Sequence, residues 1–322
     1  MPKAIPSLSL NELVETHRDF KRLAPATALH YAKVQKLFSS ETGLEYVHEL
    51  YLTRTKLKII KWRNVVIDRS SAVTFNNYLG HLRTLINFAI QEELISERIN
   101  PLVSIEKVKH YKIKKKTVSL CLLKKCVNYL NQDPEPLEAA WFWKTTVKFL
   151  YMTGIRRKQI VNIQWKDIDL LNKILSTHSN KSKKEWDIPL TDDLVSELLY
   201  LLRMTQQVIK ALVIGEDYVF RIALFDPRFK IYDETLQMKP DQITDFYAGT
   251  LSNHIGERIT PHRLRHTMGT IIANSAEIKD TGGIKSLQVI MGHANVSTTY
   301  GYVHPDMGDL RKTQLNLPPL SL

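Results

Sequence analysis

The sequence predicts a mostly α-helical protein of two domains, the second of which also carries a small antiparallel sheet. Its 322 residues are too many for one ordinary hydrophobic core. Apolar residues at helical spacing, separated by short polar breaks, dominate the first 101 residues. A pair of short strand patterns flanks a lysine-rich turn between residues 173 and 190. An all-helical domain followed by an α+β domain accounts for all three observations.

The first domain is predicted to contain five helices, at residues 13–23, 26–38, 43–50, 51–62 and 71–95. Basic side chains recur there among aromatic ones, a mixture that suits a surface lying on a phosphate backbone. An ordinary helical bundle with a charged, solvated rim remains the alternative. The basic residues are Lys33, Lys36, Arg54, Lys56, Lys58, Lys61, Arg63 and Arg83, and the aromatic ones are Tyr31, Tyr51, Trp62 and Tyr78.

The charge of the chain points to a polyanionic partner. Lysine and arginine number 45 against 33 acidic residues, which gives a net charge of +12 and a pI near 9.5. A basic protein that is merely soluble is the alternative. The sequence has no run of about 18 apolar residues and no apolar core of a signal peptide, so we expect a cytoplasmic, nucleoid-associated protein with no membrane contact. Cys121 and Cys126 match no disulfide or zinc spacing and are expected to be core residues.

A basic segment is expected to link the two domains. Six lysines fall between residues 107 and 116 without an intervening acid. We assign residues 1–106 to a helical DNA-binding domain, 107–117 to the linker and 118–322 to the catalytic domain. A linker that crosses a duplex would contact phosphates, whereas a flexible solvated tether is the alternative. The predicted DNA-binding lysines here are Lys112, Lys114, Lys115 and Lys116.

The second domain opens with helices at residues 119–130, where Ser119 is a suitable N-cap, and at residues 137–152. Thr153 and Gly154 should break the second helix, so that Arg156 lies at the start of the next. Strands are predicted at residues 173–177 and 185–190, and their lysine-rich turn could reach a ligand. Further helices follow at residues 193–208 and 240–255. The irregular residues 221–236 are interpreted as a surface insertion.

The C-terminal stretch concentrates histidine, arginine and tyrosine. Thr260 is a suitable N-cap and Pro261 suits the first helical position, so His262 and Arg265 should share one helix face. A helix at residues 284–291 should stop at Gly292, which places His293 at a fixed turn. A third helix is predicted to begin near residue 297 and to carry Tyr300 and Tyr302. These lie about 200° apart around a helical axis, so only one of them can face a shared site.

These residues suit chemistry on a phosphodiester. Arginines can contact two phosphate oxygens at once and match the charge that grows on a pentavalent phosphorus. Histidine can share protons near neutral pH, and tyrosine becomes a nucleophile where cationic neighbours favour its phenolate. A lysine could protonate the leaving oxygen. Because arginines and lysine act as the charge clamp, we expect no metal, ATP or other cofactor.

Four motifs together resemble the signature boxes of the tyrosine recombinase, or phage integrase, family. They are TGIRRKQIVNIQWKDIDL, NKSKKEWDIPL, PHRLRHT and MGHANVSTTYGYVH, in order over residues 149–304. The resemblance implies a C-shaped DNA clamp and six catalytic residues: Arg156, Lys181, His262, Arg265, His293 and the nucleophile Tyr302. Lys183 and Lys184 are rivals of Lys181 in the same turn and otherwise predicted DNA contacts.

The resemblance also implies that the partner is double-stranded DNA and that a homo-tetramer assembles on paired sites and exchanges strands through a Holliday junction. It further implies a simple recombinase of a mobile element, encoded by a bacterium or a phage. Accessory DNA-bending proteins are possible partners. A type IB topoisomerase and a DNA-binding regulator without turnover are the alternatives. Gln159, where the family often carries an acid, is the only residue that favours the regulator. Leucines alternate through the last eight residues, and the tail at 307–322 is interpreted either as a device that docks on a neighbouring protomer or as a frayed end.

Overall fold

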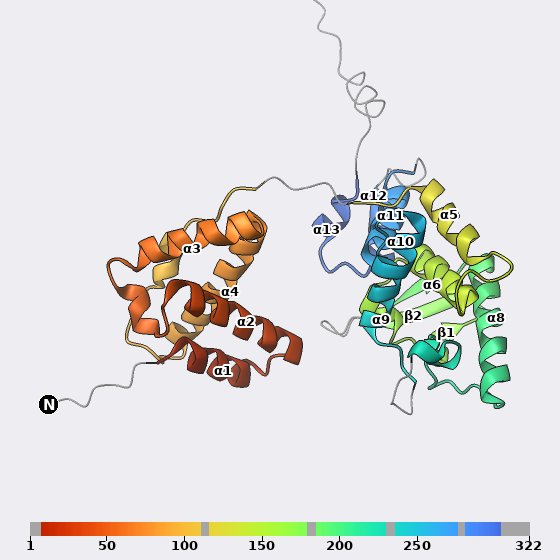
Figure 1. The fold of residues 1–322 in the computed structure, drawn as a ribbon, viewed down its shortest axis with the longest axis horizontal. Coiled ribbons are helices and arrows are strands. Elements are labelled where there is room, and N and C mark those ends of the chain that lie inside the picture. Colours follow the sequence, from red (N-terminus) through yellow and green to blue (C-terminus); the bar gives the residue numbers. More distant parts are fainter. Residues whose placement is uncertain (1–7, 111–115, 179–184, 230–235, 276–280, 304–322) are drawn as a thin grey trace, which may run out of the picture. The chain divides into compact units, whose positions relative to one another are not determined.

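The computed structural model describes residues 8–110, 116–178, 185–229, 236–275 and 281–303. The chain divides into two compact units, Met1–Ile113 and Lys114–Leu322 (Figure 1). Each unit buries its own hydrophobic core. Within the described residues no helix is long and apolar enough to cross a bilayer.

The first unit is a helical bundle. Its α-helices are α1 (Leu10–Lys21), α2 (Pro25–Thr42), α3 (Thr55–Arg69) and α4 (Ala72–Gln91), with 3₁₀ turns at Val47–Tyr51 and Pro101–Ser104. Trp62 is buried between the rings of Phe38 and Phe75, at centroid distances of 5.0 and 5.6 Å. The predicted helix at 43–50 is wrong, because Gly43 ends α2 in the left-handed conformation and only the 3₁₀ turn follows it.

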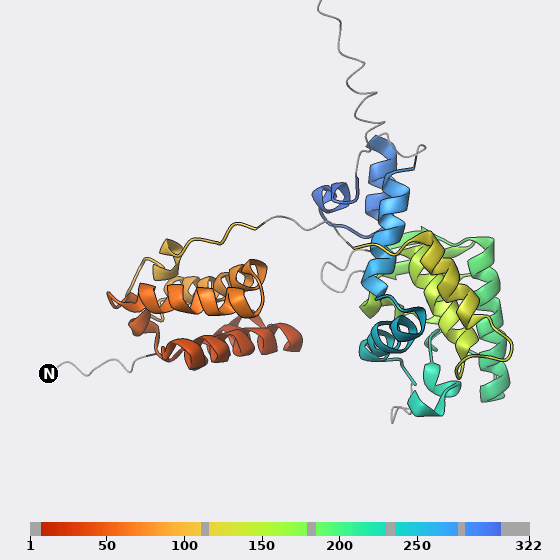
Figure 2. The same ribbon diagram turned by 45° about the horizontal axis from the view of Figure 1, so that its top comes forward.

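The second unit surrounds α6 (Ala140–Thr153), which packs against α5 (Leu120–Leu130), α8 (Asp192–Ile209) and α11 (Pro261–Ala273) (Figures 1 and 2). Nine of the fourteen residues of α6 are buried. The helix therefore lies in the core of the unit, and this packing fixes the position of the C-terminal end of the helix. The predicted cap of α5 is confirmed, since the Ser119 side chain accepts a hydrogen bond from the amide of Leu122. The remaining elements are α7 (Arg157–Ile160), α9 (Pro240–Asp245), α10 (Ser252–Ile255), α12 (Thr281–Ile290) and α13 (Val296–Tyr300).

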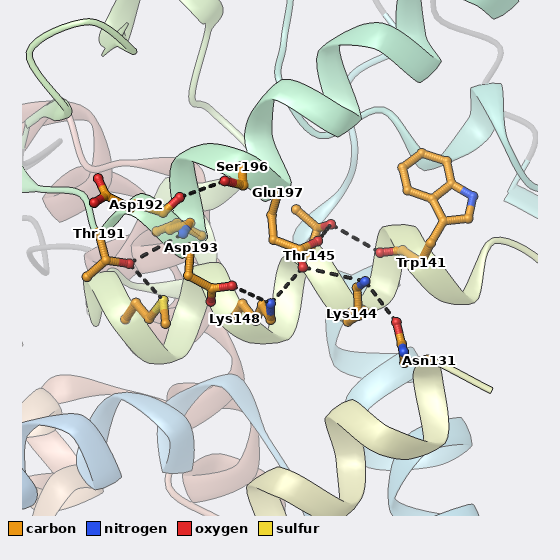
Figure 3. Close-up of polar contacts among 12 residues, drawn as sticks. Asn131, Trp141, Lys144, Thr145, Lys148, Thr191, Asp192, Asp193, Ser196 and Glu197 are labelled. Carbon is orange, nitrogen blue, oxygen red and sulfur yellow. Dashed lines mark hydrogen bonds and ion pairs between the residues drawn. The ribbon is translucent and has the colours of Figure 1, made fainter.

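Charged side chains join α6 to α8 (Figure 3). Lys148 donates to Asp193 at 2.9 Å and to Glu197 at 2.7 Å, and Glu197 also accepts from Thr145 at 3.0 Å. Lys144 lies 3.4 Å from the same Glu197 carboxylate. Two lysines therefore meet two acids in this cluster, which we call the α6–α8 network.

A three-stranded antiparallel sheet lies in the second unit in the order β1 (Ile168–Asp169), β2 (Ile174–His178) and β3 (Glu185–Pro189). The two predicted strands are confirmed, whereas β1 was not expected because it contains two residues. Trp186 of β3 donates its indole N–H to the carbonyl of Ile290, and its ring fills the space beside Gly292. The sheet therefore supports the turn that carries His293.

Three expectations are corrected. Cys121 is exposed, and only Cys126 is buried, because Cys121 lies on the outer side of α5. Residues 221–229 are not a surface insertion, since Ile222 in the 3₁₀ turn Ile222–Leu224 is buried, and so are Arg221 before this turn and Asp226 after it. The predicted helix at 240–255 is interrupted by a π-helical segment, Phe246–Leu251.

Candidate active site

The turn between α6 and α7 positions Arg156. Gly154 has φ +62°, a conformation that suits glycine, and a Cβ there would overlap the terminal methyl of Met268. The chain then turns sharply, and Arg156 occupies the N-cap position of the short helix α7 with its side chain exposed. Glycine adopts this conformation without strain, and the turn places Arg156 beside the pocket that Arg265 of α11 also lines.

Helix α11 supplies the next residues. The predicted cap is confirmed, because the Thr260 side chain accepts from the amide of Arg263 and Pro261 is the first helical residue. His262 is exposed and Arg265 is buried, but both line a pocket of about 350 Å³ together with Arg156. The pocket thus gathers three of the predicted catalytic residues from two separate segments.

Arg265 is a buried cation whose described partners are all uncharged. Its side chain donates to the carbonyls of Gly154 and Met291, the latter at 2.6 Å, and lies 3.0 Å from Nε2 of His293. Burial, and next the charge of Arg156, lower its pKa to about 10, so that it still carries its charge at neutral pH. In the described part of the chain no carboxylate lies at ion-pair distance from either arginine. The pair therefore presents uncompensated positive charge to the pocket.

His293 is fixed at the end of α12. Gly292 has φ +56°, which confirms the predicted helix stop, and His293 is buried. Because arginine can only donate, Nε2 of His293 accepts from Arg265, and the ring proton is on Nδ1. Nδ1 lies 2.9 Å from the hydroxyl of Thr299, which is fully buried. We assign the neutral Nδ1–H tautomer on this pattern.

Tyr302 and Tyr300 face different surroundings, as predicted, but not on one helix. Helix α13 ends at Tyr300, and Tyr302 lies in the turn that follows. Tyr302 is 2% exposed whereas Tyr300 is 52% exposed. The Tyr302 ring is stacked 5.9 Å from the ring of His293, and its hydroxyl lies 2.9 Å from Nδ1 of His266. Tyr302 is thus the tyrosine that joins the site.

The electrostatic balance at Tyr302 differs from the expectation. Burial raises its pKa and outweighs the guanidinium groups of Arg265 and Arg156, which lower it. The Tyr302 hydroxyl is therefore a neutral phenol in this structure. Its activation requires a group that takes the proton as well as cations that stabilise the oxygen.

Most of the predicted lysines fall outside the described residues. These are Lys181, Lys183, Lys184, Lys112, Lys114 and Lys115, whereas Lys116 is described and exposed. Gln159 accepts from the amide of Arg156 at 2.9 Å and donates to Thr177 and to the carbonyl of His178. It therefore links the Arg156 turn to the end of β2. Arg157 is partly buried beside Thr244.

Three residues of the site were missed from the sequence. His266 contacts Tyr302, Thr299 contacts His293, and Gly269 leaves room for the Tyr302 ring, since a Cβ there would lie 3.0 Å from it. His266 follows His262 by four residues on α11, and this helical spacing was the available signal. Among the described residues, no three histidine, cysteine or acidic side chains gather as they would around a metal ion.

The profile of the phage integrase family matches residues 121–308. A protein of Pseudomonas syringae described as tyrosine recombinase XerC is 28% identical over 98% of this chain, and one of Pseudomonas aeruginosa is 29% identical over 79%. The chain spans 64% and 59% of these two proteins' lengths. XerC of Staphylococcus epidermidis is 27% identical over 91% of this chain and 96% of its own.

Two solved structures share the fold. The Tn1549 transposon integrase in complex with a circular intermediate DNA has a TM-score of 0.70 at 16% identity, covering 97% of this chain and 100% of that one. A lambda integrase tetramer bound to a Holliday junction has a TM-score of 0.66 at 15% identity, covering 93% of this chain and 78% of that one.

Proposed function

Because the chain belongs to the phage integrase family, we propose that it is a site-specific DNA recombinase that cuts and rejoins double-stranded DNA. The observation that carries the proposal is the uncompensated charge of buried Arg265 beside the Tyr302 hydroxyl. A buried cation without a counter-ion is costly, and a bound anion would balance it. A phosphodiester supplies both the charge and the paired oxygens that a guanidinium prefers.

The cleavage step follows from this placement. The Tyr302 oxygen attacks phosphorus and forms a 3'-phosphotyrosyl bond, while the bond from phosphorus to the 5'-oxygen breaks. Arg265 and Arg156 stabilise the negative charge that grows on the phosphate oxygens. His262, which lines the pocket, adds a further polar contact. The leaving 5'-oxygen takes a proton from Lys181, an assignment that rests on the motif resemblance.

The joining step reverses cleavage with the 5'-hydroxyl of a second strand. Phosphodiester energy is kept in the protein link, so the reaction requires no ATP. We propose exchange through a Holliday junction within a homo-tetramer that encloses DNA as a C-shaped clamp. The lambda integrase tetramer bound to a Holliday junction and the Tn1549 integrase bound to a circular intermediate DNA support this. The basic linker would contact phosphates, accessory DNA-bending proteins could assist, and the tail at 307–322 would dock on a neighbouring protomer.

Covalent trapping tests the proposal. Incubating the protein with a nicked duplex that carries its target site should yield a protein–DNA adduct that survives denaturation. Tyr302→Phe should abolish the adduct, because phenylalanine lacks the attacking oxygen. Tyr300→Phe is the matched control and should retain it, since Tyr300 faces solvent.

Other results would sink the proposal. An adduct that persists in Tyr302→Phe and disappears in Tyr300→Phe would exclude Tyr302 as nucleophile. Specific binding without any adduct would indicate a DNA-binding regulator. Relaxation of supercoiled DNA that carries no target site would indicate a type IB topoisomerase.

A further inference from the structure

A second histidine of α11 lies between the pocket and the tyrosine. His266 is 8% exposed, and its Nδ1 is 2.9 Å from the hydroxyl of Tyr302. On its other side its ring packs edge-on against the ring of His262, at a centroid distance of 4.1 Å. His262 is exposed and lines the pocket. The order of these groups is therefore pocket, His262, His266 and Tyr302.

The surroundings of Tyr302 suit a proton that its oxygen shares with His266. Burial raises the pKa of the Tyr302 hydroxyl and outweighs the charges of Arg265 and Arg156, so the group is a neutral phenol. A neutral phenol donates, and a neutral imidazole has one nitrogen that accepts. The 2.9 Å contact therefore suits a hydrogen bond from the Tyr302 hydroxyl to Nδ1 of His266.

His293 is placed for a different task. Its ring stacks on Tyr302, but its two nitrogens contact Arg265 and Thr299. Nε2 of His293 accepts from Arg265 and therefore faces the guanidinium. Nδ1 of His266, in contrast, lies at hydrogen-bond distance from the reacting oxygen.

We propose that His266 is a catalytic residue that holds the Tyr302 hydroxyl and accepts its proton during cleavage. This inference rests on Tyr302 being the nucleophile. As the bond from the Tyr302 oxygen to phosphorus forms, the phenolic proton moves to Nδ1 of His266, and the bond to the 5'-oxygen breaks with a proton supplied by the leaving-group acid. Rejoining returns the proton from His266 to the tyrosine oxygen, so His266 ends each cycle as it began.

Substitution of His266 by asparagine separates holding from proton transfer. The amide of His266→Asn can place an oxygen near the position of Nδ1, but it does not take a proton. Single-turnover cleavage should fall about 100-fold, within the range typical of a lost general base. DNA binding should remain within about twofold. His254→Asn is the matched control and should cleave as wild type, because His254 is exposed on α10.

Replacing Tyr302 by a fluorinated tyrosine of lower phenolic pKa distinguishes a base from a structural residue. A phenol of lower pKa loses its proton more easily and depends less on a base. In that background, His266→Asn should therefore lower the cleavage rate only about tenfold. An equal loss in both backgrounds would show that His266 takes no proton. If the wild-type protein forms no adduct, the proposed function fails; if it forms one that Tyr302→Phe loses, and His266→Asn cleaves normally, only this inference fails.

A measurement on the wild-type protein tests the role of His266 even if the His266 variant does not fold. In ¹⁵N spectra of the histidine rings, His266 Nδ1 should resonate as an unprotonated acceptor and shift in Tyr302→Phe. Tyr300→Phe should leave it unchanged. A protonated Nδ1 in the wild-type protein would overturn the assignment.

Discussion

The α6–α8 network and the candidate site are both clusters of partly or fully buried polar groups in the second unit, yet they treat charge differently. In the network, Lys144 and Lys148 meet Asp193 and Glu197. Burial pulls the pKa of Lys148 down, but its hydrogen bonds to the two acids outweigh burial and raise it. The charges stabilise one another, as a structural contact requires.

The site contains two arginines and no described carboxylate at ion-pair distance from them. Burial lowers the pKa of Arg265 as it does that of Lys148, but here no described carboxylate outweighs it, and Arg156 adds to the decrease. A cluster that leaves its cations uncompensated is poorly arranged for stability and well arranged for an anion. This difference distinguishes a binding site from a structural network without reference to any relative.

Removing a cation from the site should have the largest effect on activity. Arg156→Ala should slow single-turnover cleavage about 100-fold or more, which is the scale of losing a preorganised charge-stabilising donor. Binding to the target duplex should weaken far less, because many phosphate contacts share that task. Gel-shift affinities measured beside cleavage rates check this. A parallel fall in both would make Arg156 an anchor rather than a catalyst.

The next effect concerns the tautomer of His293. Thr299→Val removes the oxygen that accepts from Nδ1–H of His293, which favours the tautomer that turns a ring proton towards Arg265. Cleavage should fall about tenfold, equivalent to about 1.4 kcal/mol. Thr299→Ser keeps the hydroxyl and should cleave within about twofold of wild type. Equal rates for the valine and serine variants would contradict the assignment.

Local signals in the sequence predicted the parts of the site that local geometry determines. Thr260 and Gly292 act within one helical turn, so their positions and that of His293 followed from capping rules. The contact between His266 and Tyr302 joins residues 36 positions apart and depends on how the turn after α13 packs against α11. Spacing alone could not predict it. For the same reason Tyr302 was assigned to a helix that in fact ends at Tyr300.

In the fold, too, local signals predicted some elements, whereas elements that depend on long-range packing were missed. Strands β2 and β3 were predicted because their own alternation specifies them, whereas β1 has two residues and exists by pairing with β2. The burial of Arg221 and Asp226 was missed because charged residues are usually exposed. These side chains are buried by long-range packing, which the sequence pattern of the segment does not record.

The network predicts an effect on stability with none on chemistry. Lys148→Met should lower the free energy of unfolding of the second unit by about 1 kcal/mol, because Glu197 keeps Lys144 and Thr145 as partners. The lysine pKa is raised in the folded state, so this difference should be full below about pH 10, the unfolded value, and shrink as the pH rises through the folded value. Urea unfolding at several pH values checks it. Slower cleavage by folded Lys148→Met would contradict the view that the α6–α8 network stabilises the fold and takes no part in the chemistry.

The smallest expected effect tests the charge comparison directly with a simple anion. Sulfate that binds between Arg156 and Arg265 would relieve their repulsion and stabilise the folded state by mass action, by about 0.4 kcal/mol at a concentration equal to its dissociation constant. That corresponds to a rise of about 1 to 2 °C in the unfolding midpoint of a domain of this size. Tryptophan fluorescence follows the second unit, because four of the five tryptophans lie in it.

Sulfate also stabilises proteins in general by its exclusion from their surface, so the informative quantity is the difference between variants. Chloride at equal ionic strength provides the baseline for each protein. Lys148→Met should keep the full sulfate increment, since its network is already balanced, whereas Arg156→Ala should lose most of it. If sulfate raises the unfolding midpoint of all three proteins equally, the arginines do not form an anion site. The two clusters would then differ in their residues but not in their capacity to bind an anion.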